Sequence, residues 1–176
     1  MSRRNRRAHL NDYELSDDGG YEYRGTLWRW KRPEQRESFL RAAWALLGGA
    51  AACLVAAGFV PAVGVGTTFI VLVPYITSFV AAALSAGALW KLTHEGDKVR
   101  DHVYHSAVEG LTPRLFVGLV AAIACAVGQA ICVVVRVGEV TSAPLAAVYL
   151  LCMLGCALCL GLLLKRLGAQ VFVQAS

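Results

Sequence analysis

The separation of charged residues from four long apolar runs constrains this chain more than any other feature. The runs cover residues 42–60, 67–90, 115–135 and 145–164, and none contains Asp, Glu, Lys or Arg. Each is close to the roughly 20 apolar residues that a helix needs to cross a bilayer. A charge at the bilayer centre costs at least about 2.5–3.5 kcal/mol, so membrane spans avoid charges. The pattern predicts an all-α integral membrane protein with four transmembrane helices.

Composition excludes the other broad classes of protein. Of the 176 residues 57% are hydrophobic and 16% are charged, with a mean hydropathy of +0.54. Soluble domains carry about 25% charged residues, and disordered chains are less apolar still. Six cysteines are too few for a disulfide scaffold of this length. The excess of Arg over Lys, with abundant Ala, Gly and Val, is typical of a GC-rich bacterial gene. We therefore expect the protein to be located in the cell membrane of a bacterium.

The distribution of Lys and Arg predicts how the spans are oriented. Ten of the 17 basic residues precede the first run, four lie between the second and third, and two follow the fourth. The other two connections hold only Arg136. Because cytoplasmic connections carry the excess of Lys and Arg, we expect both termini in the cytoplasm. The chain then forms two antiparallel hairpins, N-in and C-in.

We expect three parts along the chain. Residues 1–32 form a basic and aromatic cytoplasmic segment that is partly disordered. Residues 33–166 form the transmembrane domain, which begins near Pro33 because proline suits the first helical position. Residues 167–176 form a short cytoplasmic tail.

The connection between the second and third spans shows a regular apolar pattern. Apolar residues recur every four positions, at Val99, Val103, Ala107 and Leu111. This spacing predicts a short amphipathic helix from about Asp97 to Glu109, which lies on the bilayer or against the N-terminal segment.

Tryptophans beside basic residues are candidate interfacial anchors. Trp28 and Trp30 alternate with basic residues in T-L-W-R-W-K-R, and Trp90 ends the second run. Indole rings and basic side chains both favour the headgroup region of a bilayer. The first segment is alternatively a short strand that docks on a partner. We expect the basic N-terminal segment to contact anionic headgroups, and nothing in it indicates binding to nucleic acid.

Few polar side chains lie inside the spans. Tyr75, Ser78 and Ser85 share one face of the second span, and Gln129 is the strongly polar residue of the third. This candidate polar in-membrane face is interpreted as a packing seam with interhelical hydrogen bonds, and a solute path is the alternative. The spans contain no ionisable residue that would couple transport to an ion.

The last two spans concentrate the cysteines. Because the connection at residues 136–144 is short, these spans should be antiparallel neighbours, with Cys125 level with Cys156. The small faces Cys125/Gly128/Cys132 and Cys152/Gly155/Cys159 are expected to meet with free thiols. Cys156-Ala-Leu-Cys159 has the spacing of thiol oxidoreductases, but an apolar helix suppresses thiol reactivity.

Acidic and histidine residues gather in the connection before the third span. Asp101, His105 and Glu109 share one helical face, with His102 beside it. Such a face either binds a divalent metal or is an ordinary solvated surface. The spacing matches no metal signature, and we found no catalytic or phosphate-binding motif. The expectation is a protein that is not an enzyme and has no cofactor.

Small residues four positions apart are frequent in the spans. They occur at Gly48/Ala52, Ala121/Cys125, Ala124/Gly128/Cys132, Gly155/Cys159 and Ala157/Gly161. Such spacing lets helices approach closely. It favours a non-enzymatic subunit or accessory of a membrane complex, or a self-associating membrane protein. The alternatives are a small-solute transporter or channel component that works as an oligomer, and a membrane thiol oxidoreductase.

Overall fold

The structure is a computed structural model that describes residues 13–15, 21–23, 27–31, 33–61, 68–96, 98–135, 143–168 and 172–175. Four long helices dominate it: α1 (Arg36–Phe59), α2 (Phe69–His94), α4 (Leu111–Val135) and α5 (Ala143–Gly168). Three short helices accompany them: η2 (Pro33–Gln35), α3 (Asp101–Val103) and η3 (Tyr104–Glu109). The strands are β1 (Tyr13–Leu15), β2 (Tyr21–Tyr23), β3 (Leu27–Trp30), β4 (Lys98–Arg100) and β5 (Phe172–Ala175).

The four predicted spans are confirmed as helices. They contain 24, 26, 25 and 26 residues, and each is long and apolar enough to cross a membrane. At 1.5 Å per residue they measure about 36–39 Å, so they exceed the roughly 30 Å hydrocarbon core. As predicted, the first helical region begins at Pro33, where a 3-10 turn leads directly into α1.

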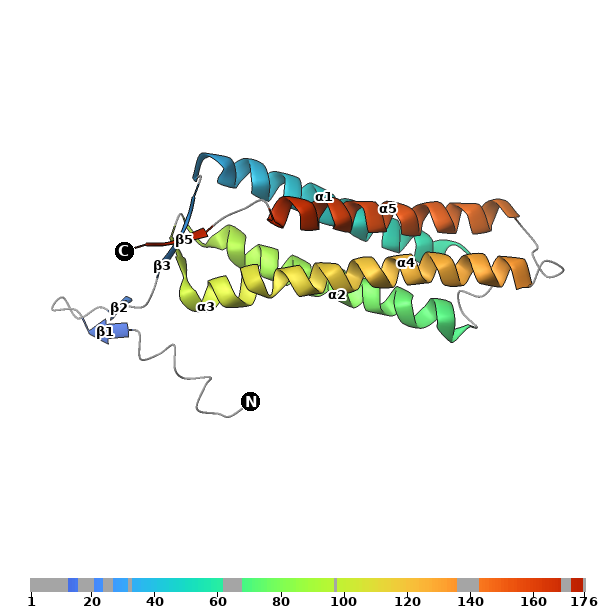
Figure 1. Ribbon diagram of the computed structural model, residues 1–176, viewed down its shortest axis with the longest axis horizontal. Helices are drawn as coiled ribbons and strands as arrows, with labels where there is room; N and C mark the ends of the chain where they lie inside the picture. Colours follow the sequence, from blue (N-terminus) through green and yellow to red (C-terminus); the bar gives the residue numbers. More distant parts are fainter. Residues whose placement is uncertain are drawn as a thin grey trace.

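The helices form an elongated antiparallel bundle (Figure 1). Around the bundle the order is α1, α2, α4, α5, and α5 closes the ring against α1. The prediction that the last two spans are neighbours is confirmed, because α4 packs along α5. α1 packs much more extensively on α5 than on α2, its partner in the predicted hairpin. The contact between the chain's first and last spans was not evident from the sequence.

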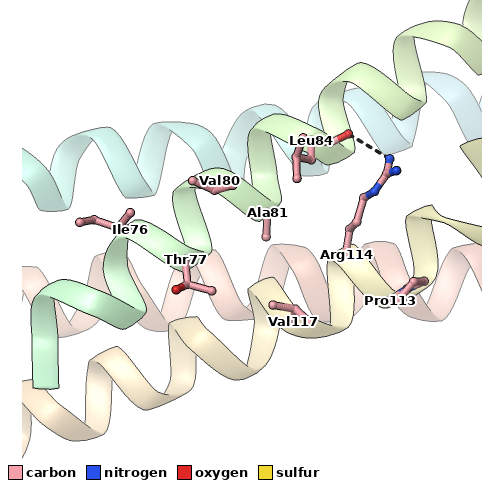
Figure 2. Close-up of a pocket in the computed structure, with 8 residues that line it drawn as sticks. All are labelled: Ile76, Thr77, Val80, Ala81, Leu84, Pro113, Arg114 and Val117. Atoms are coloured by element: carbon pink, nitrogen blue, oxygen red, sulfur yellow. Dashed lines mark hydrogen bonds between the residues drawn. The ribbon is translucent and has the colours of Figure 1, made fainter. Parts of the chain in front are cut away.

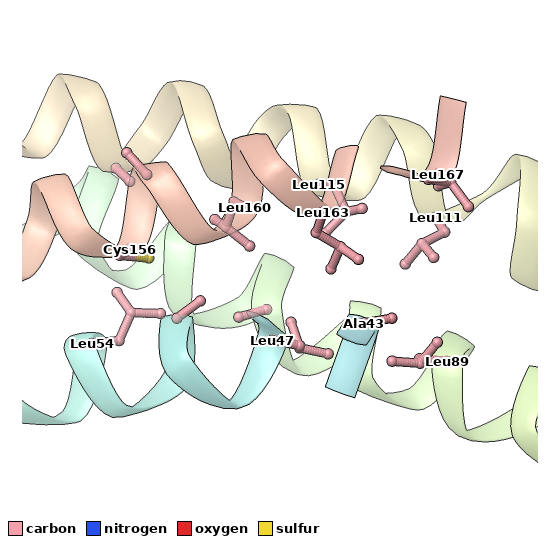
Figure 3. Packing of buried hydrophobic residues seen from close by; sticks show 14 of the residues in the cluster. Ala43, Leu47, Leu54, Leu89, Leu111, Leu115, Cys156, Leu160, Leu163 and Leu167 are labelled. Carbon is pink, nitrogen blue, oxygen red and sulfur yellow. The ribbon is translucent and has the colours of Figure 1, made fainter. Parts of the chain in front are cut away.

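Leucine side chains from all four helices fill the bundle interior (Figure 3). Leu54, Leu89, Leu115 and Leu160 are each at most 1% exposed. Since lipid tails are as apolar as leucine, this association depends on close packing rather than on escape from water. The outward side of each helix carries large exposed apolar side chains, among them Ile70, Leu84, Phe116, Leu151 and Leu158. This outer surface suits contact with lipid.

The predicted meeting of the two cysteine-containing small faces is wrong. A Cβ atom at Gly155 would lie 3.2 Å from the Sγ of Cys53, and one at Gly49 would lie 3.3 Å from the Sγ of Cys159. The small face of α5 therefore packs on α1. Gly128 of α4 lies instead against Ile70 of α2. Each helix has two neighbours in the ring. The small face of α5 is directed toward α1 and that of α4 toward α2, so the two faces do not meet.

The backbone of α2 one turn before Pro74 lies close to Gly128 of α4. Pro74 has no N–H to donate to the Ile70 carbonyl four residues earlier. That carbonyl oxygen lies 3.0 Å from the position a Gly128 Cβ would occupy. A Cβ at position 128 would therefore require the backbone at Ile70 to shift by a few tenths of an ångström.

The sheets are the main departure from the all-helical expectation. β3 pairs antiparallel with both β4 and β5, and β1 pairs antiparallel with β2. The helix predicted over Asp97–Glu109 is corrected at its start, because Lys98–Arg100 is a strand and the helical part begins at Asp101. The apolar residues that recur every four positions are all buried, but Val99 is in the strand and Val103, Ala107 and Leu111 are in the helical segments that follow. Asp97, most of residues 1–26 and both remaining interhelical turns lie outside the described residues.

We predict that Gly128→Ile lowers the thermal unfolding temperature of the protein in detergent. The new side chain would collide with the backbone of Ile70, and overpacking of this kind costs about 1–3 kcal/mol. Gly87→Ile is the matched control, because nothing lies within 4 Å of a Cβ at that exposed position of α2. Equal unfolding temperatures for the two variants, measured by circular dichroism, would contradict the α2–α4 contact.

Candidate functional site

Strands β3 and β5 and the short helix α3 lie together at one end of the bundle (Figure 1). There β3, the strand before α1, pairs with β4 from the middle of the chain and β5 from its tail. Leu27 lies opposite Arg100 on one side and Ala175 on the other. We call β3, β4, β5, α3 and η3 together the end cap. Three segments far apart in sequence thus converge on one surface.

Trp28 joins the sheet to the helical part of the end cap. Its indole Nε1 donates a hydrogen bond to Oδ1 of Asp101 at 2.8 Å. Its ring stacks on Tyr104, with centroids 4.1 Å apart and planes 9° apart. A half-buried indole held on both an edge and a face has a fixed position. Trp28 therefore belongs to the packing of the end cap.

The other two predicted anchors have different surroundings. Trp30 is 2% exposed and lies 5.7 Å from the ring of Phe39, so it contacts protein rather than lipid headgroups. Trp90 is 60% exposed on α2, with the ring of His94 at 4.5 Å. An interfacial anchor needs an exposed indole, which Trp90 offers and Trp30 does not.

Arg36 and Trp44 tie α1 to the C-terminus of α2. Nη2 of Arg36 donates to the backbone oxygens of Thr93, at 3.3 Å, and Glu95. Nε1 of Trp44 donates to Oγ1 of Thr93 at 3.1 Å. A guanidinium at this position satisfies terminal carbonyls and offsets the negative end of the helix dipole. These contacts position the first helix relative to the end cap.

A row of titratable side chains runs along α3 and η3. Nδ1 of His105 lies 2.6 Å from Oε2 of Glu109, and its Nε2 lies 3.5 Å from Oδ1 of Asp101. Both ring nitrogens therefore face carboxylates, which is the geometry of an ion pair. No group of three His, Cys, Asp or Glu among the described residues is placed to hold a metal ion. The His102 side chain lies outside the described part of the chain.

This row precedes the charge-free run of residues 115–135 in α4. α3, η3 and α4 follow one another from Asp101 to Val135, a distance of about 50 Å at 1.5 Å per residue. The charge-free run of residues 115–135 alone accounts for about 31 Å of this length, close to the roughly 30 Å of a hydrocarbon core. η3 is a π-helical segment, in which the N–H of Gly110 donates to the carbonyl of His105 at 3.2 Å. The titratable row therefore lies outside the run that the sequence predicts to cross the membrane.

The predicted in-membrane polar residues each contact a different part of the bundle. The Tyr75 hydroxyl donates to the Leu54 carbonyl of α1 at 3.0 Å. Ser85 donates to its own helix at Ala81, at 2.7 Å, while Ser78 donates to Pro74 at 3.0 Å and Gly118 of α4 at 3.4 Å. Gln129 is fully buried. The hydroxyls of Tyr75, Ser78 and Ser85 thus donate to separate backbone carbonyls, and none of the four residues lines the surface cavities described below.

Cys125 makes a polar contact that sequence reasoning missed. Its Sγ lies 3.0 Å from the hydroxyl of Tyr149 in α5 and donates to the Val71 carbonyl of α2 at 3.4 Å. Tyr149 is fully buried, and the hydroxyl of a buried tyrosine usually has a hydrogen-bond partner. A tyrosine within the last apolar run was therefore the one feature of the sequence that could have indicated this contact. Cys53, Cys125, Cys132, Cys152, Cys156 and Cys159 are all free.

Comparison with protein-family models, with curated proteins and with solved structures gives no match.

We predict that the stability of the end cap depends on pH through the ionisation of His105. Its hydrogen bond to Glu109 raises the pKa of the imidazole above 6.5, assisted by the nearby charges of Glu109 and Asp101 and opposed by partial desolvation. The charged form then stabilises the fold fully below pH 6.5, and this contribution is lost as pH rises through the folded-state pKa. We expect Glu109→Gln to lower the pKa, as measured by NMR titration with His105→Gln for assignment.

A His105 pKa at or below 6.5 in the native protein would contradict this geometry. So would a Glu109→Gln variant whose His105 titrates at the same pH as in the native chain.

Proposed function

We propose that this protein is a non-enzymatic, multi-pass subunit or accessory of a membrane complex that associates with itself or with another membrane protein. Four apolar helices with an apolar outer surface suit a bilayer. We expect the protein in a bacterial cell membrane with both termini in the cytoplasm. In this orientation the end cap lies on the cytoplasmic side. Sixteen of the 17 Lys and Arg residues belong to segments on that side, and cytoplasmic connections carry such excess.

The use of the internal polar groups supports a structural role. Ser78, Ser85 and Tyr75 donate to backbone carbonyls within and between helices, and Cys125 contacts Tyr149. A solute path requires polar groups that converge on a hydrated space at mid-membrane. These groups stabilise helix contacts instead. A thiol oxidoreductase requires accessible thiols, and Cys156 is fully buried.

One small-residue pair carries the association proposal. Gly49 and Cys53 of α1 are used within the chain, since they contact Cys159 and Gly155 of α5. Gly48 and Ala52 occupy the next face of α1, where both are exposed and nothing lies within 4 Å of a Cβ at Gly48. Small residues four positions apart allow a second helix to approach the backbone closely. This pair is the proposed contact for another membrane helix.

The end cap offers a second contact at the membrane surface. Among the described strands, β4 and β5 are the outer ones of this sheet, with β3 between them. Outer strands present backbone groups that an extended segment of another chain can pair with. We propose that the helix contact and this edge act together in one assembly.

We predict that cross-linking in native membranes gives a discrete complex, and that Gly48→Ile weakens it. The isoleucine would hold a partner helix away from α1, and we expect about a tenfold loss of association. Gly87→Ile is the control, because Gly87 is an equally open glycine on a different helix. The measurement is the mass of the detergent-purified protein together with any copurifying subunit.

A strictly monomeric protein that copurifies with nothing would refute the proposal. A complex that survives Gly48→Ile unchanged would refute the assigned contact while leaving association intact.

A further inference from the structure

A continuous apolar groove runs along the outside of the bundle between α2 and α4. It consists of two adjoining cavities of about 410 and 310 Å³, both of which are lined by Thr77 and Val117. Each is within the range of roughly 300–1,000 Å³ that ligand pockets occupy. Along each helix the lining spans eleven residue steps, from Val73 to Leu84 and from Pro113 to Ala124, which is about 16 Å.

Small residues at the floor create the groove. A Cβ at Gly118 would lie 3.2 Å from the Cβ of Ala81, so the two helices approach closely there. Exposed side chains such as Ile76 and Val80 form the walls. The Thr77 hydroxyl donates to the Val73 carbonyl of its own helix at 2.8 Å, so it is already satisfied. The groove is therefore apolar over nearly its whole length.

Arg114 lies at one end of the groove (Figure 2). Its side chain crosses from α4 to α2, where Nη1 is 3.5 Å from the carbonyl oxygen of Leu84. A guanidinium has five N–H donors, so this long contact leaves most of them available. Among the residues that the structure describes, no carboxylate lies within 4.0 Å of Arg114. A positive charge thus opens onto an apolar groove without an acidic partner from the described chain.

The depth of Arg114 identifies what that partner would be. Residues 115–135 span about 31 Å, the thickness of the hydrocarbon core, so Arg114 sits at its boundary. Lipid phosphates lie at this level, and guanidinium binds phosphate with two parallel hydrogen bonds. The groove continues from the charge into the region that acyl chains occupy. Charge and shape together match a molecule with an anionic head and an apolar tail.

We propose that this groove is a binding site for one anionic glycerophospholipid. The Arg114 guanidinium binds the headgroup phosphate, and an acyl chain lies along the groove past Val117. Zwitterionic lipids carry the same phosphate with a compensating ammonium, so they bind more weakly. The site is distinct from the basic segment before α1 and from the proposed contact at Gly48.

The test is competition between phosphatidylglycerol and phosphatidylcholine for the detergent-purified full chain, measured by native mass spectrometry. We expect the native protein to retain phosphatidylglycerol preferentially and Arg114→Gln to reduce that preference about fivefold. Arg41→Gln is the charge control, because Arg41 pairs with Glu37 on α1 and its side chain is 80% exposed. That variant should keep the native preference.

A second variant tests the groove separately from the charge. Val117→Trp fills the space shared by the two cavities, so retention of both lipids should fall. Val127→Trp places the same bulk on an exposed position of α4 outside the groove and should retain lipid normally. Glycerophosphoglycerol, the headgroup without acyl chains, should not displace the lipid.

Several outcomes would overturn the proposal. These are equal retention of the two lipids by the native protein, an unchanged preference in Arg114→Gln, or full retention in Val117→Trp. Displacement by the free headgroup would mean that Arg114 binds soluble phosphate and that the groove takes no part.

Discussion

The hydrocarbon core offers no water to backbone N–H and C=O groups, and the structure of this chain follows from that requirement. Four charge-free runs satisfy it by becoming helices. The few polar side chains among them obey the same rule. Tyr75 donates to the Leu54 carbonyl, and Ser85 to that of Ala81. These hydroxyl groups inside the bundle therefore stabilise the helices and their contacts.

Outside the core, the chain can use sheet and aromatic contacts, and there its distant parts are joined. β3 is the centre of this arrangement because it pairs with both β4 and β5. Trp28 extends the connection to Asp101 and Tyr104, and Arg36 extends it to the end of α2. The bundle is consequently closed at one end by its own polar segments. The same end carries the titratable row of His105 and, near the start of α4, Arg114.

The sequence predicted the spans well because the cost of a buried charge acts on each residue independently. It predicted poorly which face of each helix packs on which neighbouring helix. Gly155 and Gly128 look equivalent in sequence, yet one packs on α1 and the other on α2. The specific pairings within the end cap were also beyond local patterns, since the hydrogen-bond partner of Trp28 lies 73 residues away. Val99 illustrates the limit, because a spacing of four fitted a helix while its actual place is in a strand.

Cysteine cross-linking between Arg29 and Val173 tests the account most directly, because these residues are paired across β3 and β5. Opposite residues of an antiparallel pair have Cα atoms about 4.5–5.5 Å apart, which permits a disulfide. In a chain whose six native cysteines are replaced, Arg29→Cys with Val173→Cys should form an intramolecular bond on oxidation in membranes. Arg29→Cys with Val135→Cys, at opposite ends of the bundle, should not. Failure of the first pair, or equal bonding of both, would contradict an end cap that unites the two ends of the chain.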